Sequence, residues 1–159
     1  MRPTIAILIL FFASAARPAE PRASSVSFFV STRNPLRDVS EGDLRRIFLG
    51  EISRLGNGDR IVLFVRPADS PEGRLFLDRV ARMSDIDYSQ WWLGAVFRGR
   101  ASEAPRVVAT ADAMLKAVAA DADAIGFLST PPGPLGPDIA LITIDGKAAS
   151  DPAYPIRIR

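Results

Sequence analysis

Apolar positions along the chain alternate between short continuous runs and stretches in which they recur every three to four residues. The continuous runs predict strands and the periodic stretches predict helices. Each predicted helix begins at a serine or threonine that suits the N-cap position. The predicted strands are residues 26–31, 61–65, 107–108, 124–128 and 139–144, and the predicted helices follow Ser40, Ser70, Ser84 and Thr110. This order predicts one α/β domain with a mixed, largely parallel sheet flanked by helices.

The first helix has the clearest local signals. Ser40 and Asp43 fit a capping box, Leu44 opens an apolar stripe, and Gly50 is expected to end the helix. The helix after Ser70 carries its apolar stripe at residues 75, 76, 80 and 83, and the helix after Ser84 carries one at residues 88, 91, 92 and 96. Trp91 and Trp92 are adjacent, so both cannot face the core. One is expected in the core, and the other is either half-covered or available to a partner.

The beginning of the chain has the pattern of an export signal. A short basic start is followed by the apolar run Thr4–Ala13 and by an Ala-Ser-Ala cleavage site that ends at Ala15. We therefore expect residues 1–15 to be a signal peptide, 16–25 a flexible lead-in and 26–159 the folded domain, in the periplasm or secreted. The alternative is an uncleaved N-terminal anchor. No later apolar run is long enough to span a membrane, so no span is expected after cleavage.

Composition excludes several functions. Lys and Arg total 20 against 18 for Asp and Glu, and the basic residues are scattered, so nothing predicts nucleic-acid binding. The chain has no His and no Cys. A Ser-His-Asp triad, a cysteine nucleophile and an ordinary zinc site are therefore excluded. A metal or glycosidase site built from carboxylates alone stays open as an alternative. Most acidic residues, however, fall at helix starts and turns, which are common positions for them. We expect neither an enzyme nor a cofactor.

The junction between Ile61–Val65 and the next helix is the candidate site. Arg66 follows the buried strand directly, Ser70 suits the N-cap, and Pro71 suits the first helical position. A helix N-terminus offers free N–H groups and a positive dipole end to an oxyanion, and arginine adds a planar donor fork. The alternative is a well-capped helix beside a surface arginine.

Several short segments occur in an order that resembles a known family. They are Asn34-Pro35, the segment Ile47-Phe-Leu-Gly50, Arg66 with Ser70, Trp91-Trp92, Phe97-Arg98-Gly99, the segment Ala124-Ile-Gly-Phe127 and Asp145-Gly146-Lys147. Together they resemble the phosphate-type periplasmic substrate-binding proteins of ABC transporters, and more closely the short, single-lobe relatives. The resemblance runs from about residue 26 to 154, and it implies a single lobe of the periplasmic-binding-protein-like fold.

In full-length members of that family the ligand lies between two lobes, and an Arg-x-Asp-x-Ser-Gly-Thr segment of one lobe binds phosphate. This chain matches the segment at Arg66 and Ser70. Ala68 stands where the family has Asp, although Asp69 is adjacent. Pro71 and Glu72 replace Gly and Thr, which removes one backbone donor and places a negative charge near the anion.

The resemblance therefore implies Arg66, Ser70, Asp69 and Arg74 as ligand-binding candidates, each with a plainer alternative. Ser70 is either a ligand contact or a simple cap. Arg66 either contacts an anion or pairs with Asp69 or Glu72. Arg74 either lines the rim of the site or pairs with an acid.

The function that follows is weak binding of an oxyanion such as phosphate, associated with ABC transport or sensing. A second copy or an envelope protein is expected to complete the site, because one lobe cannot enclose the anion. The alternative is an envelope protein-interaction module whose ligand site has degenerated. Residues 97–100 fit either as a binding loop or as a solvated turn.

Overall fold

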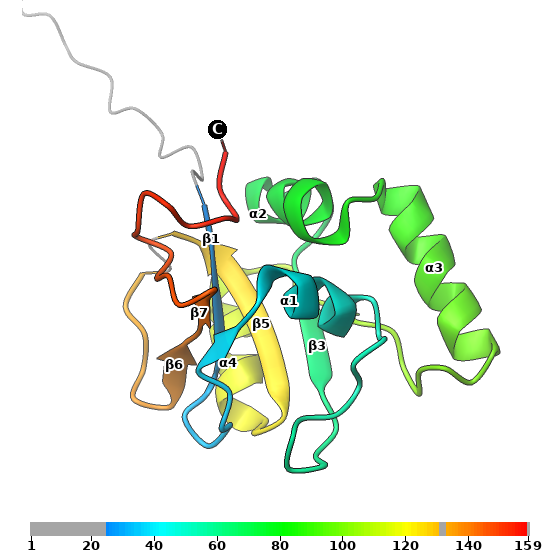
Figure 1. Cartoon of the computed structure of the whole chain (residues 1–159), viewed down its shortest axis with the longest axis horizontal. Coiled ribbons are helices and arrows are strands. Elements are labelled where there is room, and N and C mark those ends of the chain that lie inside the picture. Colours follow the sequence, from blue (N-terminus) through cyan, green and yellow to red (C-terminus); the bar gives the residue numbers. More distant parts are fainter. Residues whose placement is uncertain (1–24, 131–132, 159) are drawn as a thin grey trace, which may run out of the picture.

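The computed structural model describes residues 25–130 and 133–158, which build a sheet with helices on both faces (Figure 1). The predicted signal peptide and residues 16–24 of the predicted lead-in lie outside the described residues. The strands are β1 Val26–Ser31, β2 Asp38–Val39, β3 Val62–Val65, β4 Arg106–Val107, β5 Ala124–Ser129, β6 Ile139–Leu141 and β7 Thr143–Ile144. The helices are α1 Glu41–Phe48, α2 Pro71–Phe76, α3 Asp85–Phe97 and α4 Ala111–Ala120, with a π-helical turn, η1, at Leu77–Ala81.

The main sheet has the strand order β4-β3-β5-β1-β6. β3 is parallel to β4 and to β5, whereas β1 is antiparallel to both β5 and β6. Four strands therefore run in one direction and β1 opposes them. The α/β class and the mixed, largely parallel sheet predicted from the sequence are confirmed.

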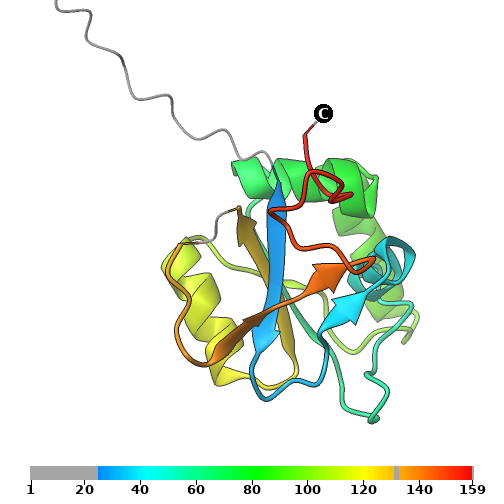
Figure 2. The ribbon, with the colours of Figure 1, turned by 60° about the vertical axis from the view of Figure 1, so that its left-hand side comes forward.

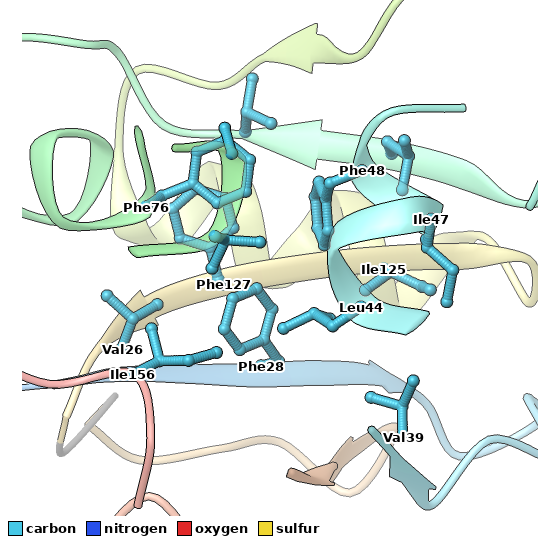
Figure 3. Close-up of a cluster of buried hydrophobic side chains, with 14 of the residues drawn as sticks. Val26, Phe28, Val39, Leu44, Ile47, Phe48, Phe76, Ile125, Phe127 and Ile156 are labelled. Carbon is cyan, nitrogen blue, oxygen red and sulfur yellow. The ribbon is translucent and has the colours of Figure 1, made fainter. Parts of the chain in front are cut away.

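The three central strands are buried on both faces, which explains their almost continuous apolar sequences. On one face, Phe28 of β1 and Phe127 of β5 pack with Phe48 of α1 and Phe76 of α2 (Figure 3). The rings of Phe76 and Phe127 stack with their centroids 4.8 Å apart. This aromatic cluster joins α1 and α2 to the centre of the sheet.

Helix α4 covers the opposite face (Figure 1). Its Met114 and Val118 pack with Phe29 and other side chains of that face. Gly126 of β5 permits this approach, because a Cβ there would lie 2.8 Å from both the Met114 sulfur and Val118 Cγ2. The sheet is consequently a rigid layer between two apolar clusters.

The last predicted strand is divided in two, and β2 was not predicted. β6 pairs with β1, and the Ile142 N–H still donates to Phe28 O at 2.9 Å. The chain then leaves β1, and β7 pairs in parallel with β2 (Figure 2). A two-residue strand such as β2 carries no alternation by which sequence reasoning could detect it.

The helix predicted after Ser70 also differs from expectation. It is α-helical over Pro71–Phe76 and continues as η1, and Arg82 ends it in the left-handed conformation with φ 55°. The apolar residues expected from the period are still buried at Phe76 and Val80. The periodicity therefore predicted the buried face but not the widened last turn.

The tryptophan pair on α3 divides as expected. Trp92 is buried and its indole N–H donates to Phe48 O at 3.2 Å, whereas Trp91 is half-buried and donates to Leu49 O at 2.9 Å. Tyr88, one turn earlier, also donates to Phe48 O, at 2.9 Å. These hydrogen bonds tie α3 to the end of α1.

Within residues 25–130 and 133–158, no helix combines the length and the apolar character that crossing a bilayer requires.

We expect the aromatic cluster to dominate stability. Phe127→Ala removes a fully buried ring that contacts three others, and should lower the free energy of unfolding by about 3–5 kcal/mol. Phe97→Ala is the matched control, because Phe97 is 91% exposed and its removal should change stability by no more than about 0.5 kcal/mol. Urea unfolding followed by circular dichroism measures both, and equal losses would contradict the assigned core.

Candidate functional site

The connection between β3 and α2 places the candidate residues at the carboxyl end of β3. Ser70 is the N-cap of α2, with its hydroxyl accepting a hydrogen bond from the Gly73 N–H at 3.0 Å. The same hydroxyl donates to Pro67 O at 2.7 Å. Both hydrogen bonds of the Ser70 hydroxyl are therefore made within the β3–α2 connection and the first turn of α2. Its proton is already donated to Pro67 O.

Gly73 makes this arrangement sterically feasible. A Cβ at position 73 would lie 2.0 Å from Pro67 O, well inside the distance that real atoms tolerate. The Pro67 carbonyl can therefore approach the first turn of α2 only because residue 73 has no side chain. The result is a tight connection that holds Arg66 close to that first turn.

Arg66 is nearly enclosed, with only 10% of its side chain exposed. Its Nη1 donates to Val108 O at 2.7 Å, which links it to the end of β4. Its Nε is buried and has no hydrogen-bond partner, because Glu72 Oε1 lies 3.9 Å away. That distance is too long for a hydrogen bond, although the two charges attract. The guanidinium is thus neutralised only in part.

Glu72 is the acid that faces Arg66. It lies in the first turn of α2, where the helix dipole favours a negative charge, and its residue is buried. Its carboxylate occupies the region where the family segment has a threonine. The pairing anticipated as the alternative for Arg66 is therefore present, at a distance that leaves arginine donors unused.

The other two candidates lie at the surface. Asp69 and Arg74 are exposed, and neither takes part in an ion pair among the described residues. The segment therefore brings Arg66, Ser70 and Glu72 together and leaves Asp69 and Arg74 outside this group.

A pocket of about 540 Å³ opens beside Arg66, between the β3–α2 connection and α3. Its walls include Phe76, Tyr88 and Trp92. The polar atoms of Tyr88 and Trp92 are bonded to Phe48 O, so their rings present carbon surface. Burial also raises the pKa of Tyr88 far above its ordinary value, so the phenol remains a neutral donor.

Sequence reasoning did not find this pocket. The available signal was a second apolar stripe on α3, at Ile86, Leu93 and Phe97, whose spacings of seven and four residues place them on one helical face. All three are exposed, whereas Tyr88 and Trp92 face the core. A helix with apolar residues on both faces indicates a second contact surface, and here Leu93 lines the pocket.

These features define one class of fold: a lobe of the kind found in phosphate-type substrate-binding proteins. The structure resembles an ABC-type phosphate transport receptor from Vibrio cholerae with a TM-score of 0.61 and 18% identity, over 79% of this chain and 48% of that one. It resembles a putative phosphate ABC transporter substrate-binding protein from Clostridium perfringens, solved with bound phosphate, with a TM-score of 0.61 and 16% identity, over 79% and 46%.

A third similar structure is PstS from Borrelia burgdorferi, with a TM-score of 0.60, 14% identity and coverage of 84% and 54%. No family model and no curated protein sequence matches the chain. The resemblance inferred from the sequence is therefore confirmed at the level of the fold, and the chain spans about half the length of these proteins.

A matched pair of substitutions tests what the cap at Ser70 contributes to the candidate site. Ser84 caps α3 in the same way, accepting from the Asp87 N–H at 3.1 Å. Ser70→Ala and Ser84→Ala should each lower the free energy of unfolding by about 1 kcal/mol. Ser84→Ala should leave phosphate affinity unchanged, whereas Ser70→Ala should weaken it, because the Ser70 hydroxyl closes the connection that holds Arg66. Equal phosphate affinity in the two variants would contradict a role of the Ser70 cap in positioning Arg66.

Proposed function

We propose that this chain is a periplasmic or secreted binding protein, and not an enzyme, that holds a small oxyanion such as phosphate weakly at Arg66. The observation that carries the proposal is the state of that guanidinium: it is 10% exposed, lies at the carboxyl end of a central strand, and bonds to the described residues through Nη1 alone. Ligands of open α/β sheets bind in this region. The fold shared with proteins named for phosphate transport supports an oxyanion as the ligand.

The remaining candidates contribute less directly. Arg74 is exposed and attracts an anion from a distance, an effect that salt screens. Ser70 keeps the connection closed and so fixes the position of Arg66. Asp69 can take part only by accepting a hydrogen bond from a protonated oxyanion, because a carboxylate has no donor at neutral pH.

Three features make the proposed binding weak. Glu72 competes for Arg66, Pro71 removes one N–H from the start of α2, and a single lobe leaves the anion partly in water. Two or three charge-assisted hydrogen bonds would each contribute about 1.5–3 kcal/mol to binding if they were fully buried. Exposure to solvent reduces these contributions, so we expect a dissociation constant in the roughly millimolar range. In this proposal a second copy or an envelope protein supplies the missing wall. The names of the proteins that share the fold support an association with ABC transport or sensing.

An interaction module in the envelope is the second candidate. The observation in its favour is a set of exposed apolar side chains, namely Ile86, Leu93 and Phe97 of α3 and Val107 of β4, of which Phe97 is 91% exposed. A photo-crosslinking residue at position 97 should capture a specific envelope protein if this reading holds. The same photo-crosslinking residue placed at position 116, where Lys116 is exposed on α4, provides the control.

Titration with phosphate tests the oxyanion proposal. Calorimetry on the protein should give a dissociation constant of roughly 1 mM, and Arg66→Ala should remove the binding because it removes the donors. Pro71→Gly combined with Glu72→Thr should tighten phosphate binding by about tenfold, since it restores an N–H and deletes a competing charge. Arg46→Gln, an equal change of charge at an exposed position of α1, is the control and should leave the affinity unchanged.

Two results would contradict the proposal. One is phosphate binding that survives Arg66→Ala in a protein shown by circular dichroism to be folded. The other is a double variant at positions 71 and 72 with no change in anion affinity, which would favour the interaction module.

A further inference from the structure

The pocket beside Arg66 is much larger than an inorganic oxyanion. Its volume is about 540 Å³, within the range of about 300–1,000 Å³ typical of sites for organic ligands. A water molecule in the liquid occupies about 30 Å³, so phosphate would leave most of this space to solvent. The size of the pocket therefore argues for a ligand with a body attached to its charged end.

We propose that the natural occupant is a monocarboxylate with an aliphatic or aromatic body, whose charged end lies at Arg66. This inference rests on the proposed function, because the same arginine holds the anion. It differs in the class of ligand, since most of the contact is with carbon and not with oxyanion donors.

The walls of the pocket support an apolar body. Phe76, Leu77, Trp92 and Pro105 line it, and Arg66 is the cation among its lining residues. The Trp92 indole N–H and the Tyr88 hydroxyl are both bonded to Phe48 O, so neither is left to bind a polar ligand. An aliphatic chain or an aromatic ring would contact these surfaces without leaving a buried polar group unpaired.

The mouth of the pocket supports the same conclusion. Leu93 and Val107 both line it, yet they are 72% and 66% exposed. An occupant with an apolar body would remove these two side chains from water. Burial of apolar surface is favourable in proportion to the area covered, so each carbon added to the ligand should strengthen binding.

The charges around the pocket disfavour ligands with more than one negative charge. Glu72 faces Arg66 at 3.9 Å, and the exposed carboxylate Asp85 also lines the pocket. Both acids repel each negative charge of a ligand, so the dianionic form of phosphate is repelled more than a monoanion. A carboxylate still fits the planar donor fork of arginine.

The test is a titration series with acetate, butyrate, hexanoate and phosphate, with hexan-1-ol as the uncharged probe. Affinity should rise with the length of the aliphatic chain. Each added methylene should increase the affinity by at most about fourfold, the value for a fully buried methylene. Hexanoate should therefore bind at least about tenfold more tightly than acetate or phosphate. It should also bind at least about tenfold more tightly than hexan-1-ol, because the alcohol lacks the charge-assisted bond to Arg66.

Variants on α3 provide the matched comparison. Leu93→Ser should weaken hexanoate at least about threefold and leave phosphate unchanged, because it removes apolar surface at the mouth. Ile86→Ser is the control: Ile86 is 69% exposed on the same helix and is not among the residues that line the pocket. It should change neither affinity.

The outcomes separate this inference from the proposed function. Phosphate binding that depends on Arg66, with hexanoate no tighter than acetate, would overturn the inference and leave oxyanion binding in place. Binding of neither phosphate nor hexanoate would overturn both. Equal affinity for hexanoate and hexan-1-ol, or equal losses in Leu93→Ser and Ile86→Ser, would overturn the placement of the ligand.

Discussion

The candidate site depends on the close approach of the Pro67 carbonyl to the first turn of α2. That approach exists because Gly73 has no Cβ, and the Ser70 hydroxyl closes it from both sides by donating to Pro67 O and accepting from the Gly73 N–H. The connection holds Arg66 against the helix start instead of letting it extend into solvent. Without it, a flexible arginine would satisfy its donors with water, and there would be no partly neutralised guanidinium to hold an anion.

The sheet supplies the support for this connection. β3 lies between β4 and β5, and side chains on both faces of the sheet are buried, so its carboxyl end is held in place by packing on two sides. α3 is attached by the burial of Tyr88, Trp92 and Ala95 in the core and by the hydrogen bonds of Tyr88, Trp91 and Trp92 to the end of α1. The face of α3 that carries Ile86 and Phe97 remains exposed, whereas the face that carries Tyr88 and Trp92 borders the pocket. Rigid support and an open apolar wall therefore meet at Arg66, a combination typical of sites for small molecules.

Much of the fold follows from sequence periodicity. Phe28 and Phe29 alternate between the two apolar clusters, and the caps at Ser40, Ser70 and Ser84 mark three helix starts. The π-turn, β2 and the division of residues 139–144 depend on tertiary contacts that no local pattern encodes. For the site, the position of Arg66 beside a strand end could be predicted, but its partial pairing with Glu72 and the pocket beneath α3 depend on distances across elements. Of the second apolar stripe on α3, Leu93 lines that pocket, whereas Ile86 and Phe97 are not among its lining residues.

The central claim is that the Arg66 guanidinium has donors available to an anion while Glu72 remains beside it. The most direct measurement is the NMR resonance of the Arg66 Nε–Hε group, followed as hexanoate and then phosphate are added. We expect hexanoate to cause a saturable shift of this resonance, phosphate to cause a smaller shift at the same concentration, and Arg46 to show no matching shift. An Arg66 resonance that stays fixed while either anion binds elsewhere would contradict the central claim.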